Sequence, residues 1–557
     1  MKKYFWIFIF IGLFIFIFHK AHRPLPTSQE IKDHFFVFVV STYNAEKTLE
    51  KTLLSILNQT YQNFKIIYID DGSVDQTEKV AKTFIEKNDK ERKIEFIRFE
   101  KPKGLLERAY SAAISAYDED IVIFLDERAY LKDKTILEQI NDNFKNFDIW
   151  LLYGSSINDK TNRLEKAKRV YSSNLFTTSA RDAFWKPCLF KAFYSSLLKK
   201  VRLEDFFFRG KFTSSSFDSS YMFAMLEMAS NHTKCISKAL CHYYPKEQIL
   251  LPCDKAKIKC MRKIRLSQSY EALNSLKKEE HRKKADLIIF SYHRPLQLYA
   301  LLESTEKYVK DLQNISVIYR SDVEKFTKAY EKVNQRFPTV RFIMQTHPKE
   351  DFRPLLLETI QRSNDYIIFA VDDILFKDYV DISHCLDYLE KTKSYFFSLR
   401  LGDHITYHYM GDYPQPIPHH IMLPNSVMGW HIDAAKGDWY YPTSVDVTIY
   451  RKEDILQDLT SFSFHNPNSL EINWFEFYKK KHLKQNRYRT GLCYTKSKAI
   501  NLPLNLVHVS KNRNMNNFDV EELLDKFNND FLLDISSVSK IENPSVHFEM
   551  EPQFVKQ

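Results

Sequence analysis

Glycine is scarce in this sequence, with 10 residues among 557, against a usual share of about 7%. No GxxxxGK[ST] motif occurs, which argues against a phosphate-binding loop of the P-loop type. No recognised nucleic-acid motif accompanies the net charge of +10, so we predict no nucleic-acid partner. The charge is spread along the chain, as in a solvated basic surface or one that attracts anionic lipids or substrates.

Cysteines at disulfide-framework or zinc-site spacings are also missing. The seven cysteines are odd in number, mostly far apart, and never arranged as CxxC. This pattern favours buried thiols in a reducing compartment. Hydrophobic residues make up 44% of the chain and charged residues 27%, which excludes a disordered or linker-like protein. The length indicates about two or three domains.

The N-terminus carries one long apolar run, from Tyr4 to Phe18, flanked by Lys2-Lys3 and His19-Lys20. The run is shorter than the roughly 20 residues that cross a bilayer comfortably. A cleaved signal peptide is the alternative, but no small-x-small cleavage site follows the run. Lysines at both ends favour a single uncleaved membrane anchor helix.

Buried-type strands alternate with amphipathic helices after the anchor, which predicts a parallel α/β sheet with right-handed crossovers. The expected strands of the first unit are 35–40, 66–69, 94–99 and 121–125, with helices at 49–57, 75–87 and 105–117. The same order recurs later, with strands at 287–290, 315–319, 340–345 and 366–371, and helices after Pro295 and near 323–336 and 353–363. The sequence therefore predicts two α/β units of one element order.

Polar and acidic residues follow the strands of the first unit, where open α/β sheets bind their ligands. Strand one ends in Ser41-Thr42-Tyr43-Asn44, strand two in Asp70-Asp71-Gly72-Ser73, and strand four in Asp126-Glu127-Arg128. Carboxylates at these positions suit a nucleobase, a ribose, or a cation bound to a diphosphate.

This half resembles a family 2-type glycosyltransferase with the GT-A fold over roughly residues 35–245. The resemblance is carried by VVSTYNAEKTLEKTLLSILNQTYQNFKIIYIDDGSVDQT, IVIFLDERAYL, FDIWLLYG and FDSSYMFAMLEMA. It implies that the nucleotide of a sugar donor binds at Thr42, Asn44, Asp70 and Asp71. It also implies that Asp126 contacts ribose or metal, and that Asp218 is the base near the acceptor.

One motif departs from that family. The family reads Asp-x-Asp-Asp after strand four, whereas this chain has Asp126-Glu127-Arg128-Ala129. A divalent metal needs several oxygen ligands. Arg128 is therefore a candidate for neutralising the diphosphate itself, and the alternative is a degenerate first site.

The second unit is similar to a GT-A-type glycosyltransferase less specifically, through its strand order, SYHRP and VDD. We expect Ser291 and Arg294 to bind the donor, and the intact pair Asp372 and Asp373 to bind metal. A surface turn is the alternative for this pair. Further candidates are Glu471 as a base and His508 as a late metal ligand, against structural roles for both.

The resulting hypothesis is a membrane-anchored protein with two tandem GT-A-like domains. It transfers a sugar from a nucleotide-sugar donor to a glycan, lipid-linked or protein acceptor, with Mn²⁺ or Mg²⁺ acting mainly in the second domain. The alternatives are a non-catalytic nucleotide- or glycan-binding scaffold and a nucleotidyltransferase. Because nucleotide sugars are made in the cytosol, we expect the domains to be cytoplasmic, with a Golgi-type lumenal enzyme as the alternative. The expected boundaries are 1–33 anchor and linker, 34–254 domain 1, 255–284 helical linker, 285–510 domain 2, and 511–557 polar helical tail.

Overall fold

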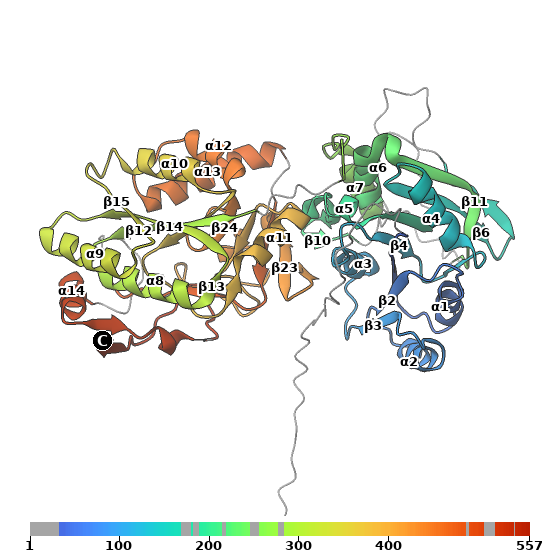
Figure 1. The fold of residues 1–557 in the computed structure, drawn as a ribbon, viewed down its shortest axis with the longest axis horizontal. Coiled ribbons are helices and arrows are strands. Elements are labelled where there is room, and N and C mark those ends of the chain that lie inside the picture. The colour runs from blue at the N-terminus through green and yellow to red at the C-terminus, as the bar shows by residue number, and fades with distance from the viewer. Residues whose placement is uncertain are drawn as a thin grey trace, which may run out of the picture.

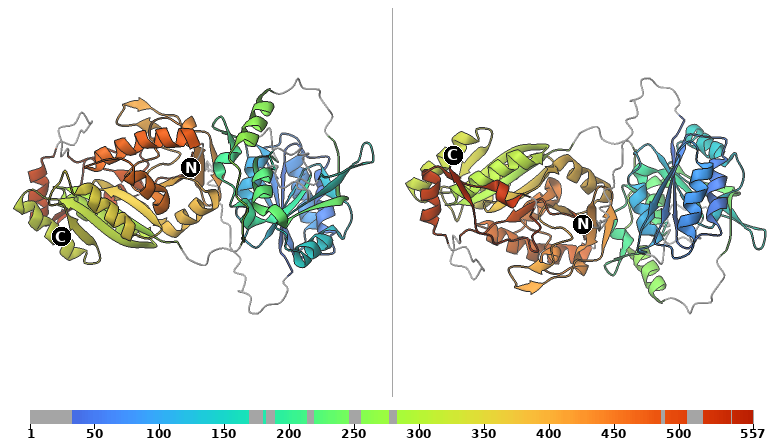
Figure 2. Two further views of the ribbon diagram at one scale, coloured as in Figure 1. Left: turned by 90° about the horizontal axis from the view of Figure 1, so that it is seen from above. Right: turned by 90° about the horizontal axis from the view of Figure 1, so that it is seen from below.

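The computed structural model places two α/β units side by side along the long axis of the molecule (Figures 1 and 2). It describes residues 33–168, 180–181, 189–213, 219–245, 255–276, 283–485, 489–505, 518–539 and 541–556. The predicted anchor at 4–18 lies outside these ranges. Within them, no helix combines the length and apolar character needed to cross a bilayer.

The first unit begins with four parallel strands in the order β3-β2-β1-β4. Apolar residues fill both faces of β1 and β4, and each of these strands is buried along its whole length. The crossover helices bury one face each, as their spacing of apolar residues predicts. The bounds are β1 Phe36–Thr42, α1 Leu49–Leu57, β2 Phe64–Asp70, α2 Thr77–Asn88, β3 Ile94–Arg98, α3 Leu105–Ala113 and β4 Ile121–Leu125.

Strands of mixed direction extend this sheet beyond β4, in the order β8-β6-β11-β5. β8 is antiparallel to both β4 and β6, while β11 is parallel to β6 and antiparallel to the short β5. The bounds are β5 Ala129–Leu131, α4 Ile136–Asn146, β6 Leu151–Asn158, β8 Phe190–Tyr194, α6 Ser219–Ala229 and β11 Thr233–Tyr243.

The second unit has its own sheet, in the order β15-β14-β12-β16-β24-β19-β25-β23-β22. Its first four strands are parallel, as the sequence predicts. The bounds are β12 Ala285–Tyr292, α8 Pro295–Tyr308, β14 Leu312–Arg320, α9 Glu324–Arg336, β15 Arg341–Met344, α10 Phe352–Arg362, β16 Tyr366–Val371, β17 Ile374–Phe376, β19 Phe396–Ser398, β22 His420–Leu423, β23 Val427–His431, β24 Thr448–Arg451, α12 Lys452–Thr460, α13 Pro467–Gln485, β25 Thr490–Tyr494 and β26 Ala499–Asn501.

The two sheets share one topology beyond their parallel halves. In the second unit, β16–β24 and β24–β19 are antiparallel and β19–β25 is parallel. In the first unit, the corresponding pairs β4–β8 and β8–β6 are antiparallel and β6–β11 is parallel. The short β17 follows the fourth strand and pairs antiparallel with β26, as β5 pairs with the end of β11. The two units therefore share one strand order and set of directions over the seven strands from β3 to β11 and from β15 to β25, which the sequence predicted only for the parallel half.

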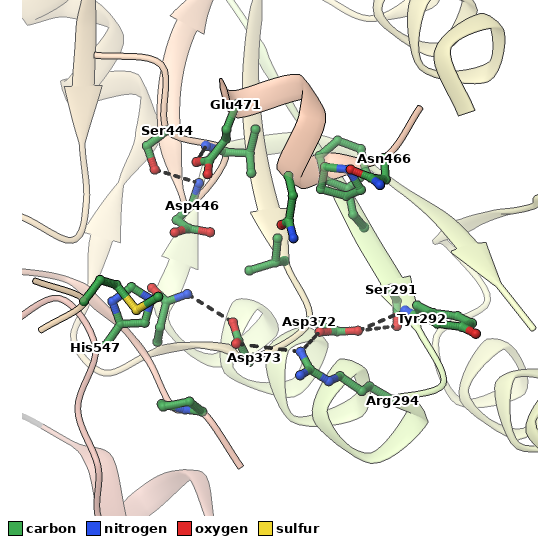
Figure 3. A pocket seen from close by; sticks show the side chains of 18 of the residues that line it. Ser291, Tyr292, Arg294, Asp372, Asp373, Ser444, Asp446, Asn466, Glu471 and His547 are labelled. Atoms are coloured by element: carbon green, nitrogen blue, oxygen red, sulfur yellow. Dashed lines mark hydrogen bonds and ion pairs between the residues drawn. The ribbon is translucent and has the colours of Figure 1, made fainter. Parts of the chain in front are cut away.

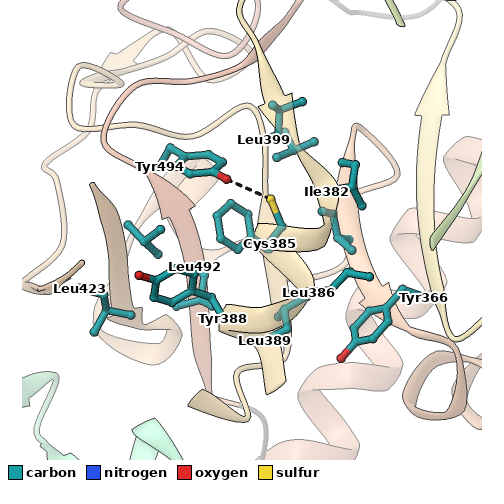
Figure 4. Packing of buried hydrophobic residues seen from close by; sticks show 14 of the residues in the cluster. Tyr366, Ile382, Cys385, Leu386, Tyr388, Leu389, Leu399, Leu423, Leu492 and Tyr494 are labelled. Carbon is teal, nitrogen blue, oxygen red and sulfur yellow. Dashed lines mark hydrogen bonds between the residues drawn. The ribbon is translucent and has the colours of Figure 1, made fainter. Parts of the chain in front are cut away.

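Helix α11 (Ile382–Thr392) closes one face of the second sheet through a dense apolar cluster (Figure 4). Cys385 is fully buried there, and its Sγ lies 3.4 Å from the hydroxyl of Tyr494. Cys260 and Cys493 are also buried, which agrees with the expected burial of thiols.

The connecting and terminal segments are less helical than predicted. The segment between the units begins with α7 (Lys255–Leu266), and no helix follows in its described remainder. The tail contains α14 (Val520–Asn528) together with the strand pair β27 (Phe531–Leu533) and β28 (Phe554–Lys556). Between these strands, His547 forms a backbone bridge with Asn501. The tail is therefore packed against the second unit and reaches strand β26.

The two units contact one another through α3 and the loop around η1 (Leu203–Phe206) on one side, and β22 and β23 on the other. Ser111 donates a hydrogen bond to the carbonyl of Met422, at 2.5 Å. The backbone N–H of Arg489 donates to Glu204 at 2.8 Å. Buried apolar residues of both units form one continuous cluster, so the units pack as one body.

Gly210 marks the tightest approach between the units. Its φ is +74°, and a Cβ at this position would lie 2.1 Å from the Cβ of Ala434 in the other unit. We expect Gly210→Ala to lower the free energy of unfolding by about 2 kcal/mol, because overpacking adds to the cost of a left-handed backbone. The measurement is denaturant unfolding beside Gly104→Ala, whose φ is +131° and whose Cβ would meet no atom within 4 Å. Equal destabilisation of the two variants would contradict close packing of the units at Gly210.

Candidate functional site

The predicted donor residues of the first unit gather at the carboxyl ends of β1 and β2. The Thr42 hydroxyl is buried and donates to the carbonyl of Ile69 at 3.0 Å. Asn44 adopts a φ of +54° and accepts a hydrogen bond from Val74 N–H. Asp70 accepts from Arg98 at 3.1 Å, and Asp71 from the Nε of Arg108 at 3.0 Å. Both carboxylates are therefore held by cationic side chains of the same unit.

Arg128 folds back onto the carboxylate that follows β4. Its Nε and Nη2 donate to the two oxygens of Asp126, at 2.8 Å each. The neighbouring Glu127 is buried and accepts from the backbone N–H of Tyr43 at 3.2 Å. The guanidinium is thus fixed beside the strand end, and Asp126 carries a cation on both of its oxygens. Asp218, the predicted base of this unit, lies outside the described residues.

The second unit brings its predicted residues together around one cavity of about 700 Å³ (Figure 3). Ser291 and Arg294 come from the end of β12 and the start of α8, and Asp372 and Asp373 follow β16. Glu471 enters from the first turns of α13 on the opposite wall. Five of the six residues predicted for this unit therefore line one cavity. The sixth, His508, lies outside the described residues.

Arg294 sits between the two adjacent carboxylates. Its Nη1 lies 3.0 Å from Asp372 Oδ1 and 3.7 Å from Asp373 Oδ2. The other oxygen of Asp372 accepts from the Ser291 hydroxyl at 2.8 Å and from Tyr292 N–H at 3.2 Å. Burial raises the pKa of Asp373 to about 6, against the lowering effect of Arg294.

A buried polar chain, missed by the sequence reasoning, connects the two walls of the cavity. Asn501 donates to Asp373 at 3.0 Å and accepts from Arg400 at 2.6 Å. Arg400 in turn lies 2.7 Å from Asp446. Asn501 ends β26 and Arg400 follows β19, so the strand-end rule would have found both had the antiparallel half of the sheet been predicted.

Glu471 has the chemistry of a proton acceptor. Its Oε1 accepts from Val445 N–H at 2.7 Å. Burial, and then the nearby charge of Asp446, raise the pKa of the Glu471 carboxyl well above its usual range. A carboxylate that binds a proton more tightly than usual is a stronger general base once it is deprotonated. The role of Glu471 as the base stays a prediction.

His547 also lines the cavity, although it belongs to the tail, where the sequence showed no chemical motif. Burial lowers its pKa to about 3, so the ring is neutral at pH 7. Its Nδ1 is buried and has no hydrogen-bond partner among the described residues. His547 reaches the cavity through its long-range backbone bridge to Asn501. A single sequence gives no indication of such a bridge.

The predicted metal position can be tested against this geometry. Mg²⁺ and similar ions are bound by one or two carboxylates together with substrate phosphates. Here the space between Asp372 and Asp373 is filled by Arg294, and both Asp372 oxygens already accept hydrogen bonds. Across the described ranges, no group of three histidine, cysteine or acidic residues could hold a metal. In the described arrangement a guanidinium therefore occupies the two carboxylates predicted to bind the metal, and the metal stays a prediction.

Comparison with known protein families identifies the class of the first unit. Residues 37–207 match the model described as glycosyl transferase family 2. The matched range contains the strand ends with Thr42, Asn44, Asp70, Asp71 and Asp126. The first unit is therefore a family 2 glycosyltransferase domain with a GT-A-like α/β fold, as the sequence motifs predicted. The second unit lies outside the matched residues.

Individual relatives agree with this class. The chain is 27% identical over 231 residues to the bifunctional glycosyltransferase pgtA of Dictyostelium discoideum, covering 36% of this chain and 29% of the relative. It is 27% identical over 162 residues to the poly-beta-1,6-N-acetyl-D-glucosamine synthase of Staphylococcus epidermidis, covering 28% and 38%. The chain thus spans less than half the length of these relatives. The crystal structure of S. aureus TarS with UDP-GlcNAc shares 20% identity, with a TM-score of 0.32 over 41% of this chain and 65% of that chain.

Proposed function

We propose that this protein is a nucleotide-sugar-dependent glycosyltransferase built from two GT-A-like units, with turnover in the cavity of the second unit. The observation that carries the proposal is the convergence of Ser291, Arg294, Asp372, Asp373 and Glu471 on one cavity, at the strand ends of a sheet that repeats the topology of the family 2 domain. Ligands of such sheets bind beyond these strand ends.

The residues divide into donor-side and acceptor-side groups. The donor side is formed by the ends of β12 and β16, where Arg294 presents a buried cation to a diphosphate. On the acceptor side, Glu471 takes the proton of the attacking hydroxyl. The bond from the anomeric carbon to the diphosphate oxygen breaks, the new bond to the acceptor oxygen forms, and the nucleoside diphosphate leaves with the electron pair.

The acceptor and the membrane belong to the same proposal and rest on the sequence. A glycan, lipid-linked or protein hydroxyl is the proposed acceptor class. The apolar run at 4–18 is the proposed anchor, with both units in the cytoplasm beside the donor pool. A non-catalytic scaffold is the competing function, because the strand-four motif of the first unit is altered.

The test of function is a panel of nucleotide sugars incubated with the full chain, with and without Mn²⁺. We expect release of the nucleoside diphosphate from at least one donor, accelerated by the matching acceptor. Binding of UDP or GDP without any turnover of the panel would favour the scaffold. Release of pyrophosphate from a nucleoside triphosphate and a sugar phosphate would favour a nucleotidyltransferase instead.

The first unit makes a separate prediction through Arg128. If its guanidinium serves a diphosphate at that site, nucleotide binding there persists in EDTA. Arg128→Ala then weakens it by about 10- to 100-fold, the scale of one charge-assisted contact. The measurement is titration calorimetry with UDP and with GDP. Unchanged affinity would reduce Arg128 to the structural partner of Asp126.

A further inference from the structure

The guanidinium of Arg294, which the proposed function places beside the donor diphosphate, has N–H donors that the described residues leave unused. A guanidinium carries five N–H donors. Its Nη1 donates to Asp372 and its Nη2 to the carbonyl of Asn505 at 2.5 Å, while its Nε is buried without a partner among the described residues. The group lines the cavity, so it is a partly buried cation with unused donors beside the donor-side strand ends.

The first unit repeats this arrangement at the equivalent strand. The carboxylate that follows β4 is Asp126, and it carries Arg128 on both oxygens. The carboxylate that follows β16 is Asp372, and it carries Arg294. The two arginines come from different places in the chain, one from the loop after β4 and the other from the loop after β12. Two unrelated sequence positions therefore each place an arginine on the carboxylate that follows the fourth strand, on both oxygens in the first unit and on one in the second.

The cavity is lined by both cationic and acidic side chains. Its lining cations are Arg294, Arg320, Lys349 and Arg400. Its carboxyl groups are Asp372, Asp373, Asp438, Asp446 and Glu471. Arg400 is committed to Asp446, and Arg294 faces the remaining pair at the strand end. A divalent ion would have to displace a buried guanidinium from two carboxylates, which is costly.

We propose that Arg294, in place of a divalent cation, binds the diphosphate of the donor in the second unit. The inference rests on the proposed function, since it names what binds the diphosphate in the same cavity. Asp372 and Asp373 then hold the guanidinium in position instead of ligating a metal. The leaving nucleoside diphosphate then contacts a cation that is fixed in place. The N–H groups of a guanidinium can donate two parallel hydrogen bonds to phosphate oxygens.

The test is titration of the full chain with UDP and with GDP, in EDTA and in MnCl₂, in an Arg128→Ala background that minimises binding at the first unit. We expect binding to be equal within about twofold in the two buffers. Arg294→Gln should weaken binding in EDTA by about 10- to 100-fold, the scale of one charge-assisted contact. Mn²⁺ should restore part of the loss, because the variant frees two adjacent carboxylates for a metal. The matched control is Arg362→Gln, an exposed arginine paired with Glu358 on α10, outside the cavity.

The outcomes separate this inference from the proposed function. Binding that requires Mn²⁺ in the Arg294-containing protein overturns the inference and leaves a nucleotide-binding glycosyltransferase intact. Absence of nucleotide binding in both buffers overturns both. Arg294→Lys keeps a charge at the site and replaces Arg294→Gln if circular dichroism shows the latter to be unfolded. Full affinity of folded Arg294→Gln in EDTA also overturns the inference, as does full affinity of Arg294→Lys, because an ammonium lacks the fork of N–H donors that the inference assigns to the guanidinium.

Discussion

Replacing Asp373 by alanine is expected to reduce sugar transfer by about 10²-fold, the scale of losing one preorganised electrostatic contact. Asp373 is partly buried at the cavity wall between Arg294 and Asn501. Its removal leaves the guanidinium with one carboxylate partner and the amide of Asn501 without its acceptor. Both defects arise where the donor is proposed to bind. We therefore expect a large fall in kcat with only a small change in the free energy of unfolding.

The matched variant is Asp126→Ala in the first unit, which removes the topologically equivalent carboxylate. We expect a much smaller loss of transfer, because Asp126 is paired with its own neighbour Arg128 and does not line the cavity of the second unit. Initial rates are compared after circular dichroism has confirmed that both variants are folded. If Asp126→Ala abolished transfer and Asp373→Ala left it intact, the roles of the two units would be reversed.

Replacing Glu471 by glutamine is expected to have a still larger effect, between about 10²- and 10⁴-fold on kcat, since a general base contributes that much. The variant keeps the shape of the side chain and its acceptor for Val445 N–H. It removes only the ability to take a proton. The control is Glu476→Gln on the same helix, whose side chain pairs with Lys479 and does not line the cavity.

The pH dependence gives this prediction a second readout. Because the pKa of Glu471 is raised, the carboxyl is still protonated at a pH where an ordinary glutamate is ionised. The base form accumulates as the pH rises, so kcat/KM should climb with pH above the range in which ordinary carboxyl groups titrate. This climb should vanish in Glu471→Gln and persist in Glu476→Gln. A profile that is flat above pH 5 in the unsubstituted protein would exclude Glu471 as the base.

The stability of the fold should move in the opposite direction over the same range. A carboxyl whose pKa is higher in the folded state than in the unfolded chain favours folding at low pH. That contribution declines as the pH rises from the unfolded pKa through the folded one. Glu471 and Asp373 both have raised pKa values. The rise in activity with pH is therefore expected to accompany a fall in the free energy of unfolding. A rise in activity caused by a larger folded fraction would instead accompany an increase in that free energy.

The parallel half of each sheet was predictable because its strands are continuous apolar runs. Phe36 to Val40 and Tyr366 to Ala370 are buried on both faces, and a run of this kind has few alternatives to a central strand. The residues that follow such strands are placed by the topology alone. Ser291, Asp372 and Asp373 were found on that basis.

The antiparallel half of each sheet could not be predicted from the sequence. The polar chain across the cavity could not be predicted either, because it depends on these strands. β19 has three residues and β26 has three, so neither carries a periodic signal. Arg400, Asn501 and His547 meet only because these short strands pair over long distances in the chain. His547 depends further on a single backbone bridge from the tail to Asn501.

The sequence also identified Arg294 and the Asp372–Asp373 pair without showing that they touch. As separate residues they suggested a phosphate ligand and a metal site. Their contact at 3.0 Å and 3.7 Å changes the interpretation, because the same carboxylates that suit a metal are occupied by a cation. Arg128 and Asp126 lie two residues apart in the sequence. Their ion pair, which has two hydrogen bonds, likewise depends on the turn after β4.

The central claim is that nucleotide-sugar turnover takes place in the cavity of the second unit. It is tested most directly by the initial rate of nucleoside diphosphate release from the preferred donor and acceptor, measured for Glu471→Gln and Asp126→Ala side by side. We expect Glu471→Gln to lose at least about 10²-fold and Asp126→Ala to retain most of the rate. Loss of turnover in Asp126→Ala with full activity in Glu471→Gln would contradict the claim and place the reaction in the family 2 domain.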